Sequence, residues 1–287
     1  MRRSAILSLV VLVAAAGTAA VVASPPVPVR LRVLRLVDHS RRARFRDGTT
    51  VPRVLVTYVR YPTRGRPPYP LIVFGHGFAL TPQTYSHLLD SWTRAGYVVA
   101  APVFPVENAN APGGPDQSDL GNEPGDISFV ISRLVGSTSP VPALVNPKKI
   151  AAAGQSDGGV AALAVAYDPR VRDRRIGAAM ILSGAAPAGF AQPAPGSPPL
   201  LAVQGTSDPI NSPSTTADYY RLMHHPKFLL WLLGASHLPP YTTNDRWAAV
   251  VDRTTTAFLN HYLRGAPLGP LLAAGTQTGV ARINAKP

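Results

Sequence analysis

One short segment of the sequence has the residue types and spacing of a nucleophilic serine. Residues 154–158 read Gly-Gln-Ser-Asp-Gly, which matches the pattern Gly-x-Ser-x-Gly, and they lie between a predicted strand and a predicted helix. A serine at such a turn needs strained backbone angles, and Gly154 and Gly158 leave room for the strand and the helix to approach each other. Ordinary glycine-rich turns also match this pattern, so the assignment of Ser156 depends on its partners.

A serine hydroxyl becomes a good nucleophile at neutral pH only when a histidine accepts its proton and a carboxylate orients that histidine. Asp208 follows a predicted strand at residues 199–204, and His237 follows another at residues 228–233. This is the chain order, Ser then Asp then His, that the turn implies. We therefore predict Ser156 as nucleophile, Asp208 as acid and His237 as base. The alternative for His237 is a structural, partly buried side chain with satisfied polar atoms.

Acyl transfer also needs two hydrogen-bond donors for the oxyanion of the tetrahedral intermediate. The predicted donors are the backbone amide of Asp157, directly after the nucleophile, and that of Phe78, on a loop at the end of an earlier strand. His76 is expected to brace this loop rather than to transfer protons. The predicted substrate contacts, at the rim of an open cleft, are Phe78, Gln155 and Tyr241.

Strands and helices alternate around these residues, beginning with an antiparallel strand pair. The predicted strands are residues 31–36, 51–61, 71–74, 97–101, 149–153, 176–182, 199–204 and 228–233. The predicted helices are residues 85–95, 126–135, 158–167, 215–223 and 247–263. With the serine turn, this alternation predicts an α/β-hydrolase fold, in which helices cover both faces of a mostly parallel sheet. The short segment at 184–198 leaves no room for a sizeable lid domain, and the tail at 273–287 is expected to be loosely held.

The N-terminal residues have the order of a secretory signal peptide. Two arginines precede an apolar stretch at residues 5–16, and small residues follow it. Cleavage after Ala23 would divide the chain into a signal peptide, residues 1–23, and one catalytic domain, residues 24–287. This predicts a secreted or cell-envelope protein. The alternative is an uncleaved membrane anchor, because the segment approaches the length of a membrane span.

The composition excludes several kinds of site. The chain contains no cysteine, so it cannot form a disulfide, use a thiolate nucleophile or bind a metal through cysteine. Its formal net charge of +13 favours acidic surfaces or nucleic acid. However, the arginines are dispersed and lack the aromatic interleaving of single-strand binders. We therefore expect a solvated basic surface, no nucleic-acid partner, and a monomer that meets a membrane only if the N-terminal segment is retained.

Several segments besides the triad match the pattern of a known family. They are Arg53-Val54-Leu55, Tyr61-Pro62, Phe74-Gly75-His76-Gly77-Phe78, Ser118-Asp119-Leu120-Gly121-Asn122 and Asp126-Ile127-Ser128-Phe129-Val130. Over residues 33–263 the sequence resembles secreted α/β-hydrolases of the dienelactone hydrolase and platelet-activating-factor acetylhydrolase branch, and it is similar to chlorophyllases and cutinase-like polyester-cleaving enzymes. The resemblance implies a serine esterase that cleaves small-molecule or lipid-like carboxylic esters through an acyl-enzyme, with no metal or organic cofactor. Gln155 stands where many relatives have His, and Asp157 where polyester-cleaving relatives usually have Met.

Two alternatives to ester hydrolysis stay open at this point. An acyltransferase or perhydrolase would use the same triad, because the acyl acceptor is selected by the exclusion of water around the acyl-enzyme. A non-catalytic cell-envelope binding protein on a hydrolase scaffold is the other alternative, since fold does not determine function. Reaction of Ser156 with a fluorophosphonate probe distinguishes the catalytic alternatives from the binding protein.

Overall fold

The computed structural model describes residues 28–141 and 143–287. The predicted signal peptide, residues 1–23, lies outside the described residues, so its removal stays a prediction. Within the described ranges, no helix combines the length and the apolar character that a membrane span requires.

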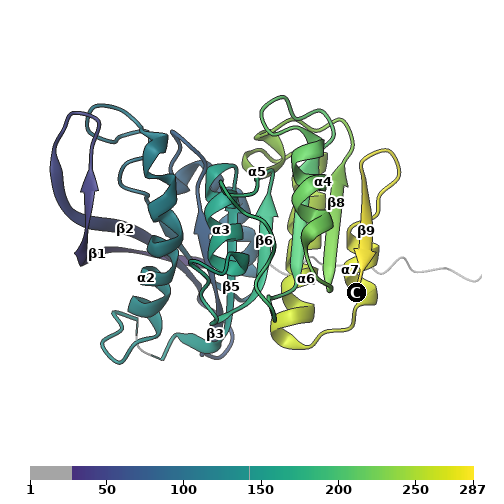
Figure 1. Ribbon diagram of the computed structural model, residues 1–287. Helices are drawn as coiled ribbons and strands as arrows, with labels where there is room; N and C mark the ends of the chain where they lie inside the picture. The colour runs from purple at the N-terminus through teal and green to yellow at the C-terminus, as the bar shows by residue number, and fades with distance from the viewer. Residues whose placement is uncertain (1–27, 142) are drawn as a thin grey trace, which may run out of the picture.

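In the described part of the chain, nine strands form one sheet in the order β1-β2-β4-β3-β5-β6-β7-β8-β9 (Figure 1). The strands are β1 Val29–Arg44, β2 Thr50–Pro62, β3 Tyr69–Gly75, β4 Val98–Pro102, β5 Val145–Gln155, β6 Ile176–Leu182, β7 Leu200–Gly205, β8 Lys227–Leu232 and β9 Ala281–Lys286. The helices are α1 Ser86–Arg94, α2 Glu123–Val135, α3 Asp157–Tyr167, α4 Pro213–Leu222, α5 Pro239–Thr242, α6 Arg246–Arg264 and α7 Gly269–Ala274. Two short 3-10 helices are η1 Pro82–Tyr85 and η2 Gln117–Asn122.

The centre of the sheet is parallel, as predicted. Strands β4, β3, β5, β6, β7 and β8 run in the same direction, while β1 and β2 form an antiparallel ribbon at one edge and β9 runs antiparallel to β8 at the other. Every residue of β3 and β4 is buried. Strands covered on both faces can be apolar throughout, which explains why their sequences read as short continuous apolar runs.

Two hydrophobic cores lie on the two faces of the sheet. Successive side chains of a strand point to opposite faces, so Leu71 and Val73 of β3 join one core while Ile72 and Phe74 join the other. Helices α2, α3 and α4 cover the first face (Figure 1), and α1, α5, α6 and α7 contribute to the core on the second. This arrangement confirms the predicted α/β-hydrolase fold class and leaves the carboxyl ends of the parallel strands free to carry functional loops.

The C-terminal tail is ordered, so the expectation that residues 273–287 are loosely held is wrong. Strand β9 pairs with β8 from Ala281 opposite Leu232 to Lys286 opposite Lys227, and Leu271 of the preceding helix is fully buried. The inward side chains of β9 include two alanines, whose small size makes the alternation hard to see in the sequence. Pairing with β8 holds the strand in spite of this weak pattern.

Candidate active site

Ser156 occupies the strained turn between β5 and α3. Its φ of 56° and ψ of −121° lie in a region that residues with a side chain rarely adopt. The turn is possible because its glycines are packed backbone to backbone. A Cβ on Gly154 would lie 2.0 Å from the carbonyl oxygen of Gly158, and a Cβ on Gly158 would lie 2.2 Å from that of Gly75. Both predicted elbow glycines are therefore required by direct contact.

The three predicted triad residues come together at the carboxyl edge of the parallel strands. The Oγ atom of Ser156 lies 3.0 Å from Nε2 of His237, and Nδ1 of His237 lies 2.8 Å from Oδ2 of Asp208. Asp208 follows β7, and His237 follows β8, which is the next strand in the sheet. Both distances are within the range in which a base can take a proton from a hydroxyl group and a carboxylate can orient that base.

The carboxylate of Asp208 is buried and fully hydrogen-bonded. Its Oδ1 atom accepts hydrogen bonds from the backbone amides of Ile210, at 2.9 Å, and Asn211, at 3.0 Å. Its Oδ2 atom accepts from Nε2 of Gln204 at 3.1 Å and faces His237. Hydrogen bonds to an ionised group offset the cost of burying its charge and hold it in one orientation.

The two predicted oxyanion donors flank Ser156. A Cβ placed on Gly77 would lie 3.2 Å from Cβ of Ser156, so the loop that continues to Phe78 lies against Ser156. Asp157 is the first residue of α3, where backbone amides have no partner within the helix. Among the described residues, neither the amide of Phe78 nor that of Asp157 donates to a protein acceptor. Their assignment as oxyanion donors stays a prediction that this geometry permits.

His76 braces the loop that carries Phe78, as expected. Its Nε2 atom accepts a hydrogen bond from the backbone amide of Phe104 at 3.0 Å, and its Nδ1 atom donates to the carbonyl of Gly77 at 2.9 Å. Because the side chain is fully buried, the pKa of His76 falls to about 4. The imidazole is therefore neutral at physiological pH and acts as a fixed link between two loops.

Two of the three predicted substrate contacts are wrong in position. Tyr241, in the short helix α5, is 1% exposed, and its hydroxyl group lies 2.9 Å from Oγ of Ser183 inside the core. Gln155 is completely buried behind the triad rather than at a rim. Phe78 is 39% exposed, and its role as a substrate contact stays a prediction.

Asp157, which borders the proposed oxyanion site, has a polar partner that the sequence alone does not reveal. Its Oδ2 atom accepts a hydrogen bond from Nε2 of Gln117 at 2.6 Å. Burial raises the pKa of Asp157, while the hydrogen bond from Gln117 and the nearby His237 act in the opposite direction. Gln117 belongs to η2, 40 residues earlier in the chain, so only the tertiary structure brings the two together.

A pair of buried glutamates lies beside this site. Glu107 and Glu123 are both completely buried, and no other described residue donates a hydrogen bond to either carboxyl group. Burial raises the pKa of Glu107 to about 8, and burial together with the neighbouring Glu107 holds the pKa of Glu123 well above its usual range. The carbonyl of Glu107 accepts a hydrogen bond from the amide of Ala79 at 2.8 Å, which ties the pair to the loop that carries Phe78.

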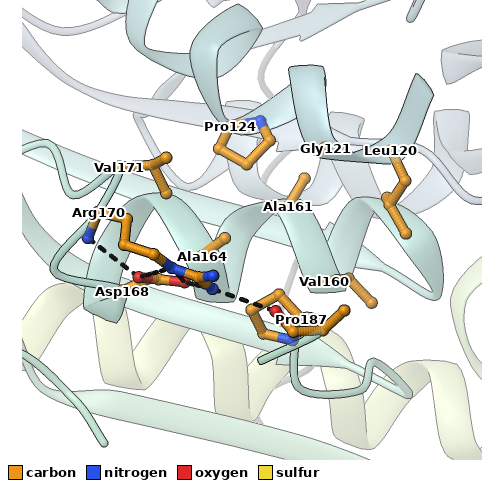
Figure 2. A pocket seen from close by; sticks show the side chains of 11 residues that line it. Leu120, Gly121, Pro124, Val160, Ala161, Ala164, Asp168, Arg170, Val171 and Pro187 are labelled. Carbon is orange, nitrogen blue, oxygen red and sulfur yellow. Dashed lines mark hydrogen bonds and ion pairs between the residues drawn. The ribbon is translucent and has the colours of Figure 1, made fainter. Parts of the chain in front are cut away.

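An apolar groove of about 390 Å³ runs along the outer side of α3 (Figure 2). It starts at Val160, which lies one helical turn after Ser156, as the hydrogen bond from the amide of Val160 to the carbonyl of Ser156 shows. It ends at Asp168 and Arg170, which pair with each other. The described residues between β6 and β7 form no helix, in agreement with the predicted lack of a lid, and two of them, Pro187 and Ala188, line the groove. The remaining lining residues are Leu120, Gly121, Pro124, Ala161, Ala164 and Val171.

The described residues contain no group of three or more His, Asp or Glu side chains arranged to hold a metal ion. The prediction that the reaction needs no metal or cofactor is not tested by this observation and stays a prediction.

Comparisons with known proteins place the chain in a family. Residues 38–214, more than half of the chain, match the model of the chlorophyllase family. The structure is similar in fold to a ferulic acid esterase from Streptomyces cinnamoneus, with a TM-score of 0.68 and 21% sequence identity over 88% of this chain and 94% of that one. No curated protein sequence is significantly similar to the chain. The chain belongs to the chlorophyllase family, and it is a carboxylic ester hydrolase with the α/β-hydrolase fold.

Proposed function

We propose that this esterase uses Ser156 as its nucleophile and passes through an acyl-enzyme. The observation that carries the proposal is the continuous series of hydrogen bonds from Ser156 Oγ to His237 Nε2 and from His237 Nδ1 to Asp208 Oδ2. A non-catalytic binding protein has no need of a strained serine whose hydroxyl group is directed at an oriented base.

In the proposed reaction, Oγ of Ser156 attacks the ester carbonyl carbon as its proton passes to Nε2 of His237. The carbonyl oxygen becomes an oxyanion, which accepts hydrogen bonds from the amides of Phe78 and Asp157. The intermediate collapses when the C–O bond to the alcohol breaks and His237 returns the proton to the leaving alkoxide. Water then attacks the acyl-enzyme through the same steps, which releases the acid and restores Ser156.

The groove along α3 supports an ester with an extended apolar part as the substrate. Its walls are mainly alanine, valine, leucine and proline, and its length from Val160 to Asp168 is about 12 Å, because a helix rises about 1.5 Å per residue. Burial of an aliphatic chain there contributes about 0.8 kcal/mol per methylene group. With the N-terminal segment predicted as a signal peptide, we propose that the enzyme meets this substrate outside the cytoplasm.

Hydrolysis of p-nitrophenyl esters by the full chain tests the assignment of the nucleophile. Ser156→Ala is expected to lower kcat about a thousandfold or more, because the remaining oxyanion donors act without a covalent step. Ser214→Ala, which removes an exposed hydroxyl group from α4, is the matched control and should retain full activity. If Ser156→Ala turns over as fast as the parent, or if the parent does not react with a fluorophosphonate, Ser156 is not the nucleophile. Products formed with competing alcohols reveal any acyl transfer.

A further inference from the structure

We infer that Gln155 and Tyr85 are positioning residues that connect the base of the triad to the oxyanion loop; the inference rests on the function proposed above. Gln155 is the last residue of β5, and Tyr85 is the last residue of η1. Both side chains are completely buried. Neither is in the triad, yet both have polar atoms within hydrogen-bond distance of the groups that surround the reacting carbonyl.

The contacts form an unbroken series. The amide of Gly77 donates to the hydroxyl oxygen of Tyr85 at 3.1 Å, and this hydroxyl group donates to Oε1 of Gln155 at 2.6 Å. On the other side of the Gln155 side-chain amide, Nε2 lies 3.2 Å from Nε2 of His237 and 3.3 Å from the carbonyl oxygen of His237. Gly77 directly precedes Phe78, so the series joins the base to one of the two proposed oxyanion donors.

The direction of each hydrogen bond follows from the chemistry of its ends. A backbone amide only donates, so Tyr85 accepts from Gly77 and has its own hydrogen available for Gln155. A backbone carbonyl only accepts, so the side of Gln155 that faces His237 must be its NH2 group. The opposite orientation would face the amide oxygen of Gln155 toward a carbonyl oxygen. Both ends therefore select the same orientation.

This orientation selects one tautomer of His237. The Nε2 atom of the imidazole receives donors from both Ser156 and Gln155, so it must be unprotonated in the resting enzyme, and the ring hydrogen resides on Nδ1 toward Asp208. This is the form that can accept the serine proton. Once His237 is protonated at Nε2, the NH2 group of Gln155 faces another donor. The amide thus favours return of the proton, and the acceptor of that proton in the forward reaction is the leaving alcohol.

A double-mutant cycle tests whether the two residues act as one unit. Gln155→Met and Tyr85→Phe should each lower kcat about tenfold to a hundredfold and leave KM within about twofold, because they misplace the base and the oxyanion loop rather than the substrate. The double variant should be no slower than the slower single variant, since either change interrupts the same series. Tyr97→Phe, which removes another buried hydroxyl group that donates to Asn260, is the matched control and should leave kcat unchanged.

The pH profile gives a readout that a purely structural role would not move. Gln155→Glu places a carboxylate beside the imidazolium, which favours the charged form, so the acid limb of kcat/KM should move to higher pH. The positioning role would be overturned if the losses of kcat in the two single variants multiplied in the double variant. It would also be overturned if the acid limb of kcat/KM stayed in place in Gln155→Glu. Fluorophosphonate labelling of the parent separates this failure from that of the proposed function, because a parent that is not labelled has no active Ser156.

Discussion

At the scale of single residues, the site depends on groups that are held from several sides. Asp208 is the clearest case, because each of its oxygens has two donors and only one of the four is His237, the proposed base. Ser156 is held by its strained backbone and by the close approach of Gly154 and Gly158. Such fixed groups need little rearrangement when charge develops in the transition state, which is where preorganised sites gain their effect.

Replacement of Asp208 by asparagine tests this arrangement. The amide oxygen of Asn is expected to keep the two backbone donors at Ile210 and Asn211, so its NH2 group would face Nδ1 of His237. This would favour the wrong tautomer of the base, and kcat should fall about ten-thousandfold while the fold is retained. Asp218→Asn, on the exposed face of α4, should change neither kcat nor the fold. An Asp208→Asn enzyme with nearly full kcat would remove Asp208 from the triad.

At the scale of elements, α3 has two roles. Its first residue, Asp157, places beside Ser156 a backbone amide with no acceptor among the described residues, and one side of the helix forms a wall of the apolar groove (Figure 2). The chain between β6 and β7, which contains no helix, contributes Pro187 and Ala188 to the same groove. One helix therefore connects Ser156, the proposed nucleophile, to the surface that we propose for the apolar part of the substrate.

Filling the groove should change chain-length preference without changing the chemistry. Ala164→Phe places a ring in the middle of the groove. We expect kcat/KM for a p-nitrophenyl ester of a long fatty acid to fall about tenfold or more, because burial of a few methylene groups is lost at about 0.8 kcal/mol each. The acetate ester should be unaffected.

Ala273→Phe on the exposed side of α7 is the control for added bulk. If Ala164→Phe lowers kcat/KM equally for both esters, the fold is damaged. If it lowers kcat/KM for neither ester, the substrate does not enter the groove.

The elements and the triad follow from the sequence more reliably than the side-chain environment does. The strands and helices around Ser156 carry strong apolar periodicity, and the order of Ser156, Asp208 and His237 is imposed by the fold. The positions of Gln155 and Tyr241 depend on which way a side chain turns inside the folded core, and no local pattern contains that information. Strand β9 was missed because pairing with β8, rather than its own composition, makes it a strand.

At the scale of the whole molecule, segments far apart in the sequence pack in the same two cores and the same sheet, so the free energy of unfolding depends on contacts between them. The buried pair of Glu107 and Glu123 connects this stability to pH, because it joins the segment after β4 to the start of α2. A buried carboxyl group is stable only in its protonated form unless a cation compensates its charge. Arg53 is already engaged by Asp119 and Asp126.

The free energy of unfolding should therefore fall as the pH rises from about 4.5 to about 8. The pKa of Glu107 is raised to about 8, above its ordinary value of 4.5, so the folded state holds a proton that the unfolded chain has released. This contribution is complete below pH 4.5 and is lost as the pH rises through 8. Urea unfolding at a series of pH values should show a decreasing midpoint, and Glu107→Gln, which cannot ionise, should flatten the curve over the same range. A parent curve that rises between pH 5 and 9 would contradict the assignment.

The two outermost strands also affect how the molecules behave toward one another. The edge strand β9 exposes Arg282 and Lys286, and the opposite edge strand β1 exposes Arg30 and Arg35. An open strand edge is a template for a strand of another molecule, but here such an approach brings like charges together. We therefore expect concentrated solutions to stay clear at low ionic strength and to become turbid first when salt screens this repulsion.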